Sequence, residues 1–307
     1  MTGWSVVRRL RIALLGMALA LAAAGIALAV FVVVSSDQLA RNAQTPPRLP
    51  LDQSPRDYGI DIYQEVVFTA SDGVALHGWA APTQNGAAIV LAHGYAANRA
   101  QLLPEAGLLA QAGFGVLLFD FRGHGESDAA RVTLGDHERR DLRAAIDFLA
   151  GQPGVDPDRL GAVGFSMGGA TLAQVAAEDG RLAAVVIEGT YPALEDLIRY
   201  RMRLFGPLGI VPALRVARQA GDVDDVRPVD DLCAISPRPL LLIYGALDRD
   251  MPDGTAQRMA AAACEPSALW VIEGARHGDY LEAAPDEYPT RLIEFFTPLA
   301  EAAPQED

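Results

Sequence analysis

The sequence contains no lysine: all 25 of its basic residues are arginine. Without lysine, Schiff-base chemistry, a lysine general base and a serine-lysine dyad are excluded. The 307 residues carry a formal net charge of -14. This charge disfavours nucleic-acid binding, because a phosphate backbone requires a basic surface. We therefore expect no nucleic-acid partner.

Cysteine is nearly absent, with only Cys233 and Cys264 in the chain. In an exported domain the two could form a disulfide, but the sequence does not bring them together, and two free, buried thiols are the simpler expectation. Neither lies near the N-terminus, which excludes lipidation there. No histidines and cysteines cluster with the spacing of metal ligands, so we expect no metal and no organic cofactor.

Charge is also missing from one long stretch, residues 12–34. This apolar run is long enough to cross about 30 Å of hydrocarbon as a helix, which predicts a transmembrane segment. Arg8, Arg9 and Arg11 precede it, and this bias places residues 1–11 in the cytoplasm and the rest of the chain outside. A cleaved signal peptide, which would release a secreted protein, is the alternative, with residues 27–29 as the cleavage site. The run is longer than a usual signal sequence and favours the anchor.

Composition divides the remaining chain into a linker, one domain and a tail. Residues 35–57 are polar and contain four prolines, which predicts a semi-extended linker. Residues 58–300 are long enough for one domain with a large core. Residues 301–307 form an acidic tail, which we expect to be solvated and frayed.

The domain opens with two strands, 65–70 and 74–79, around a Ser-Asp-Gly turn, which predicts an antiparallel hairpin. Short runs that are apolar throughout then alternate with amphipathic helices, a pattern typical of a parallel sheet covered on both faces. The expected strands are 88–92, 116–119, 160–165, 183–187, 240–244 and 268–272, and the expected helices are 102–112, 136–150, 170–178, 255–263 and 288–296.

The alternation stops between the strands at 183–187 and 240–244. Residues 193–237 therefore form an insertion over the carboxyl edge of the sheet, which we expect to act as a lid. Within it, apolar residues keep helical spacing from Leu194 to Phe205 until Gly206 and Pro207 interrupt them.

The motif Gly164-Phe165-Ser166-Met167-Gly168 lies between a buried strand and an alanine-rich helix. In a sharp strand-to-helix turn a serine is held in a strained conformation with its hydroxyl exposed, which makes Ser166 a candidate nucleophile. The other interpretation is an ordinary serine at a helix start. The two interpretations are distinguished by whether other parts of the chain supply a base and an acid for this serine.

A serine hydroxyl needs a base, and the base needs a group that orients it. Among the five histidines, His277 follows the last strand at the carboxyl edge of the sheet, where open α/β folds bind ligands. Asp248 follows the preceding strand and is the favoured orienting acid. Asp250 is the alternative two residues on. Glu188, at the end of another strand, is a second-ranked alternative acid, which we expect to be a structural hydrogen-bonding residue instead.

Two backbone N–H groups should stabilise an oxyanion. One should come from Met167, directly after the serine, and the other from Tyr95 in the His93-Gly94-Tyr95 loop after the strand at 88–92. We expect His93 to stabilise that turn. His77 and His137 are expected to be structural or solvated.

Together with Asp120-Phe121-Arg122-Gly123-His124-Gly125-Glu126-Ser127, these motifs make residues 65–296 resemble the α/β-hydrolase superfamily, in particular its serine esterases, lipases and peptidases. The resemblance implies an eight-stranded, mostly parallel sheet with a lid between the sixth and seventh strands, and a structural turn at 120–127 that removes His124 from the catalytic candidates. Related dehalogenases and epoxide hydrolases carry aspartate where Ser166 stands, which excludes those activities.

The expected function is hydrolysis of small carboxylic esters through a Ser166-His277-Asp248 triad and an acyl-enzyme. An apolar lid and a tether to a membrane favour lipid-like acyl chains as one substrate class. A serine peptidase or a thioesterase with the same triad is the alternative. A non-catalytic binding protein on the same fold is the alternative from another class.

Overall fold

The chain folds around one eight-stranded sheet in a computed structural model that describes residues 3–203, 215 and 225–301. The strand order is β1-β2-β4-β3-β5-β6-β7-β8. Only β2 runs against its neighbours, because β3 to β8 are parallel, so the predicted hairpin and the mostly parallel sheet are both confirmed. The strands are β1 (Gln64–Thr69), β2 (Ala75–Ala81), β3 (Ala88–Ala92), β4 (Gly115–Phe119), β5 (Leu160–Phe165), β6 (Leu182–Glu188), β7 (Leu240–Gly245) and β8 (Ser267–Ile272).

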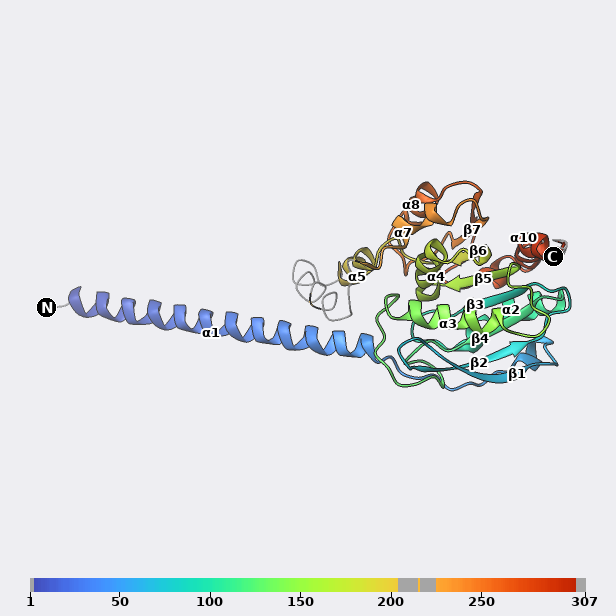
Figure 1. Cartoon of the computed structure of the whole chain (residues 1–307). Helices are drawn as coiled ribbons and strands as arrows, with labels where there is room; N and C mark the ends of the chain where they lie inside the picture. Colours follow the sequence, from blue (N-terminus) through green and yellow to red (C-terminus); the bar gives the residue numbers. More distant parts are fainter. Residues whose placement is uncertain (1–2, 204–214, 216–224, 302–307) are drawn as a thin grey trace.

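Helices cover both faces of this sheet (Figure 1). One apolar layer packs against α2 (Leu103–Gln111) and α10 (Glu287–Glu301), and the other against α3 (Glu138–Ala150), α4 (Met167–Glu178) and α8 (Thr255–Ala262). Strand β3 is buried throughout, and its alternate residues enter opposite layers. This two-sided burial explains why the central strands read as unbroken apolar runs.

Short elements complete the domain, and in the described part of the insertion between β6 and β7 there are three of them. These three are α5 (Leu194–Met202), α7 (Pro228–Asp231) and η5 (Leu232–Ile235). The helix expected from Leu194 is confirmed as far as Met202, whereas Phe205, Gly206 and Pro207 lie outside the described residues. Residues 302–307 of the expected acidic tail lie outside them too. Elsewhere the chain forms η1 (Pro55–Tyr58), η2 (Arg99–Leu102) and α9 (Tyr280–Ala283).

Helix α1 (Gly3–Gln44) is longer than the sequence predicted. The expected extended linker from residue 35 is wrong for its first ten residues, which continue the helix because they include good helix formers and the first proline comes only at Pro46. The helix is long and apolar enough to cross a membrane, as a membrane anchor or as a signal sequence.

The expectation of two free thiols is also wrong, because Cys233 and Cys264 form a disulfide. Cys233 lies in η5 and Cys264 just after α8, and these elements pack beside each other with the two Cα atoms 4.5 Å apart. The insertion and the chain after α8 approach only in the tertiary structure, so no local pattern around either cysteine could reveal the pairing.

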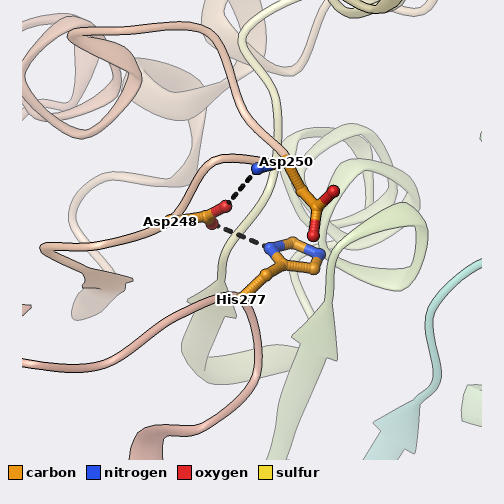
Figure 2. A group of neighbouring side chains, drawn as sticks. All are labelled: Asp248, Asp250 and His277. Carbon is orange, nitrogen blue, oxygen red and sulfur yellow. Dashed lines mark hydrogen bonds and ion pairs between the residues drawn. The ribbon is translucent and has the colours of Figure 1, made fainter.

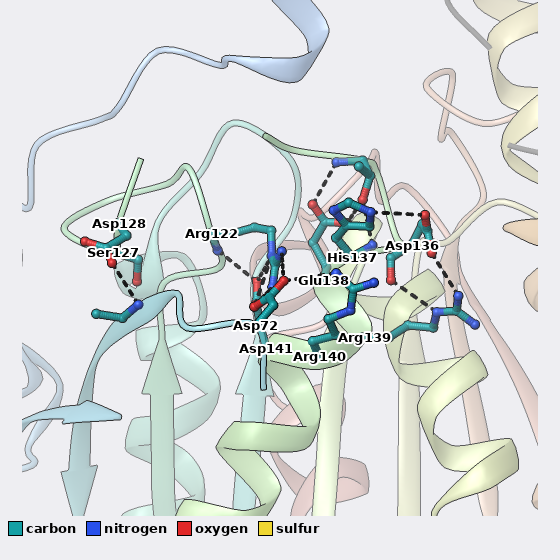
Figure 3. Close-up of polar contacts among 12 residues, drawn as sticks. Asp72, Arg122, Ser127, Asp128, Asp136, His137, Glu138, Arg139, Arg140 and Asp141 are labelled. Atoms are coloured by element: carbon teal, nitrogen blue, oxygen red, sulfur yellow. Dashed lines mark hydrogen bonds and ion pairs between the residues drawn. The ribbon is translucent and has the colours of Figure 1, made fainter. Parts of the chain in front are cut away.

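A buried ion-pair network holds the 120–127 turn against α3 (Figure 3). The Arg122 guanidinium donates to the Asp141 carboxylate and to Asp72 at the β1–β2 turn, and Arg140 also pairs with Asp72. Burial raises the pKa of Asp141 to about 6, whereas hydrogen bonding from Arg122 lowers the pKa of Asp72. Because a buried charge left unpaired typically costs about 3–5 kcal/mol, the network fixes this turn in place. The structural role expected for the turn agrees with this arrangement.

Candidate functional site

Ser166 lies between β5 and α4 in a strained backbone conformation, with φ 53° and ψ -112°. Its amide donates to the Glu188 carbonyl at 2.8 Å, which ties the turn to the end of β6. The glycines beside it are required by close packing. A Cβ on Gly168 would lie 2.1 Å from the Ala92 carbonyl oxygen, and one on Gly164 would lie 2.7 Å from the Gly168 carbonyl oxygen. Helix α4 can therefore begin directly after the serine.

Two side chains from distant loops meet this serine. His277 Nε2 lies 3.2 Å from Ser166 Oγ, and His277 Nδ1 lies 2.8 Å from Asp248 Oδ2. Figure 2 shows the second contact, with Asp248 facing the imidazole from the loop after β7. The Asp248 side chain is only 5% exposed. The structure thus brings together all three side chains that the sequence singled out.

Asp250 lies on the same loop but has a different environment. Its amide donates to Asp248 Oδ1 at 2.8 Å, and its exposed carboxylate lies 3.7 Å from Arg201 on α5. Asp248, Asp250 and His277 each place one possible metal-ligand atom within 4.8 Å of the others (Figure 2). His277 Nδ1 already binds Asp248, so a metal there would compete with the contact that orients the imidazole. We assign no metal to this group.

The loop that carries Tyr95 is held by two buried imidazoles. His93 Nε2 accepts from the Phe121 amide, so its Nδ1 carries the proton and donates to the Gly94 carbonyl. Likewise, His124 Nε2 accepts from the Ala96 amide and its Nδ1 donates to the Arg122 carbonyl. Burial lowers the pKa of His93 to about 3 and lowers the pKa of His124, which keeps both rings neutral.

These contacts occupy the N–H groups on both sides of Tyr95. The Gly94 amide donates to the Gln101 side chain at 2.7 Å and the Ala96 amide to His124 at 3.1 Å. Within the described part of the chain, the Tyr95 amide has no such acceptor. Met167 occupies the first position of α4, where an N–H has no acceptor within the helix. Both groups predicted for an oxyanion hole are therefore available to a ligand.

Comparison with known proteins identifies the family. The sequence model of the alpha/beta hydrolase fold matches residues 87–208. The Escherichia coli protein YfhR is 29% identical over 250 residues, spanning 78% of this chain and 82% of YfhR. The thiohydrolase aneE of Aspergillus aculeatus is 33% identical over 60% of each chain. The Pyrococcus furiosus esterase Pf2001 superposes with a TM-score of 0.71 and 26% identity, over 83% of this chain and 98% of the esterase. This chain belongs to the α/β-hydrolase fold family.

The remaining histidines of this α/β hydrolase lie away from the serine turn. His77 lies in β2, and His137 precedes α3 with Nε2 3.7 Å from Asp136 (Figure 3). The sequence did not predict Thr190, whose hydroxyl donates to the Ser166 carbonyl, or Gln101, which fixes the Gly94 amide. Thr190 lies just after β6 and Gln101 lies in η2, and neither belongs to a recognisable motif, so only their contacts reveal them.

Behind the site the hydrolase buries a pair of carboxyl groups. Glu188, the second-ranked acid, accepts from the Tyr288 hydroxyl at 2.5 Å, and the same hydroxyl lies 3.4 Å from Glu105. Burial raises the pKa of Glu188 to about 8 and the pKa of Glu105 to about 7. The Glu188 carboxyl is therefore uncharged at pH values near 7, where it acts as a structural hydrogen-bonding group. The acid that contacts His277 is Asp248.

Proposed function

We propose that this hydrolase cleaves carboxylic esters, with Ser166 as nucleophile, His277 as general base and Asp248 as the orienting acid. The observation that carries the proposal is the unbroken chain of contacts from Ser166 Oγ through both ring nitrogens of His277 to the Asp248 carboxylate. The strained backbone at Ser166 supports it, because such strain at a strand-to-helix turn exposes the hydroxyl.

The reaction has two steps. Ser166 Oγ attacks the ester carbonyl while His277 Nε2 takes its proton, and the amides of Tyr95 and Met167 donate to the developing oxyanion. His277 then gives that proton to the leaving alcohol as the ester C–O bond breaks, which leaves an acyl-serine. In the second step His277 takes a proton from water, the hydroxide attacks the acyl carbon, and the proton returns to Ser166 as the carboxylic acid leaves.

The same residues could cleave a thioester or a peptide, and one relative bears on this choice. The relative aneE is named a thiohydrolase, which favours a thioester as the second candidate substrate. We prefer oxygen esters because Pf2001, an esterase, matches nearly its full length in structure. A peptidase remains an alternative that uses the same triad.

A fluorophosphonate probe tests the proposal directly, since it reacts with an activated serine. The wild type should label and Ser166→Ala should not. Turnover of p-nitrophenyl esters of rising chain length, of matched thioesters and of peptide anilides then ranks the three substrate classes. A folded wild-type protein that neither labels nor turns over any of them would overturn the proposal and favour the non-catalytic binding protein.

We also propose that α1 anchors the hydrolase in a membrane with its domain on the extracytoplasmic side. The arginines before the apolar run support this orientation, and the Cys233–Cys264 disulfide favours an oxidising compartment. Protease added outside intact cells should remove the domain, and full protection would reverse the orientation. A mature N-terminus just after residue 29 would instead support the cleaved signal peptide.

A further inference from the structure

Helix α5 of the insertion is docked on the loop that carries Asp248. The Tyr200 hydroxyl donates to the Arg249 carbonyl of this loop at 3.2 Å. Earlier in the helix, Ile198 belongs to one buried apolar cluster with Met251 of the same loop. Polar and apolar contacts together therefore hold the end of α5 beside the loop.

The next side chain on α5, Arg201, faces the second acid of that loop. Its guanidinium lies 3.7 Å from the Asp250 carboxylate, and about half of each side chain is exposed. A charge-assisted hydrogen bond is about 2.7–2.9 Å long, so this contact is a loose ion pair. Among the described residues, the Arg201 guanidinium donates no hydrogen bond and pairs with no other carboxylate. Its N–H groups are therefore available to an anion that fits them better.

The Asp250 carboxylate in turn lies close to the His277 imidazole. One of its oxygens is within 4.8 Å of a His277 ring nitrogen, and Figure 2 shows the carboxylate pointing toward the ring. The two ring nitrogens are already engaged, Nδ1 with Asp248 and Nε2 with Ser166. Asp250 therefore holds a negative charge beside both the imidazole and Arg201.

The charge of Arg201 also reaches the loop of the proposed oxyanion donor. Burial raises the pKa of the Tyr95 phenol, and the Arg201 charge opposes that rise. The same two effects act on the phenol of Tyr191. A charge alters a pKa in this way only from nearby. Arg201 thus lies near both loops that the proposed reaction uses, with half of its side chain open to solvent.

Asp250 lies on the side from which the alcohol departs. His277 has to give its proton to the leaving alcohol, so the alcohol oxygen must come within about 3 Å of Nε2. The Asp250 carboxylate lies within 4.8 Å of a nitrogen of the same ring. An alcohol portion that extends away from the imidazole therefore comes close to Asp250 and to Arg201 beyond it.

We propose that Arg201 determines specificity by binding a carboxylate on the alcohol portion of the ester, which takes the place of the Asp250 carboxylate. The inference rests on the proposed ester hydrolysis and names its substrate class, which is esters whose leaving alcohol bears a carboxylate. A planar guanidinium can donate two parallel hydrogen bonds to such a group, an option that the loose contact with Asp250 leaves unused.

Two esters with the same acyl group test this inference. 4-Acetoxybenzoate carries a carboxylate on its leaving phenol, and 4-acetoxybenzamide carries an uncharged amide of nearly the same shape. Both form the same acetyl-enzyme, so a difference in kcat/KM reports only binding and acylation. The 3-substituted pair places the carboxylate at a second distance. Hydrolysis is followed with the full-length protein in detergent at neutral pH and physiological ionic strength, where a Debye length of about 8 Å screens the net charge of -14.

The wild type should prefer the carboxylate over the amide by about fivefold or more in kcat/KM in at least one pair. Arg201→Gln should lower this preference by about fivefold or more, because glutamine keeps a donor but not the charge. Asp250→Asn should raise it about two- to fivefold, because it removes the competing carboxylate and keeps the backbone amide that donates to Asp248. Arg199→Gln is the matched control on the same helix. Its guanidinium already pairs with Glu195 at 2.6 Å, so this variant should show the wild-type preference.

The melting of each variant is checked by circular dichroism, and every other result counts against one of the two proposals. Equal kcat/KM for carboxylate and amide in the wild type would overturn the inference and leave ester hydrolysis standing. The same holds for a preference that survives Arg201→Gln, that does not rise in Asp250→Asn, or that falls as far in Arg199→Gln. A folded wild type that cleaves none of the four esters would overturn the proposed function itself.

Discussion

Replacing Asp248 with asparagine is the sharpest single test of the proposed triad, because its carboxylate makes two contacts with opposite requirements. One oxygen accepts from the Asp250 amide at 2.8 Å and the other faces His277 Nδ1 at 2.8 Å. Asparagine offers one acceptor and one donor at these places. The Asp250 amide can only donate, so it selects the amide oxygen and turns the new NH₂ group toward His277.

This orientation leaves the imidazole in the wrong tautomer. The NH₂ group requires an unprotonated Nδ1, so Nε2 carries the proton and cannot accept another from Ser166. The reverse orientation would set two donors against each other in a group that is 5% exposed. That conflict costs about 1–3 kcal/mol, so the inactive orientation is favoured by roughly 5- to 150-fold. Loss of the charge that stabilises the imidazolium adds to this.

We therefore expect kcat of Asp248→Asn to fall by about 10³- to 10⁴-fold, close to the effect of this change in other serine hydrolases. Asp250→Asn is the matched control. It keeps the backbone amide and loses only the exposed contact with Arg201, which is worth about 0–1 kcal/mol, so kcat should stay within roughly fivefold. The assay is p-nitrophenyl ester turnover on variants whose melting is checked by circular dichroism. A folded Asp248→Asn within tenfold of wild type would refute the reasoning.

Three further predictions concern the framework of the site. Burial raises the pKa of Glu188 from 4.5 to about 8, so the folded state keeps a proton that the unfolded state loses, and stability falls as the pH rises through this interval. Glu188→Gln should remove the share of this fall that Glu188 contributes, leave the share of Glu105, and raise the melting temperature at pH 9 by a few degrees. An unchanged pH profile would contradict the assignment. Cys233 and Cys264 are 31 residues apart, so reducing their disulfide should lower the free energy of unfolding, measured in urea, by about 3–4 kcal/mol. In a Cys233→Ala/Cys264→Ala double variant, the same reducing agent should leave the free energy of unfolding unchanged. His124→Ala should lower kcat about 10- to 100-fold, because it releases the loop that carries the Tyr95 amide, the second oxyanion donor. His77→Ala, the control, should leave kcat unchanged. Equal effects of the two substitutions would argue against a positioning role for His124.

Much of the fold follows from local patterns. Runs of five to seven apolar residues bounded by turns predict strands that are buried on both faces of a sheet. The central strands expected from these runs agree with the strands of the structure to within one residue at each end. The positions of Ser166, Asp248 and His277 follow from the same logic, because in a parallel sheet all residues just past a strand end meet at one edge.

The sequence by itself thus determined the order of the elements, the apolar helix at the N-terminus and the side chains available for chemistry. Only the tertiary structure decided that Asp248 and not Asp250 faces His277, that the two cysteines pair, and that Ala40 of α1 is buried in one apolar cluster with Ala170 of α4. The physical reason is how far apart the interacting residues lie along the chain. Strand and helix patterns arise from neighbours a few residues apart, whereas these contacts join segments far apart in the chain, whose approach depends on how every intervening element packs.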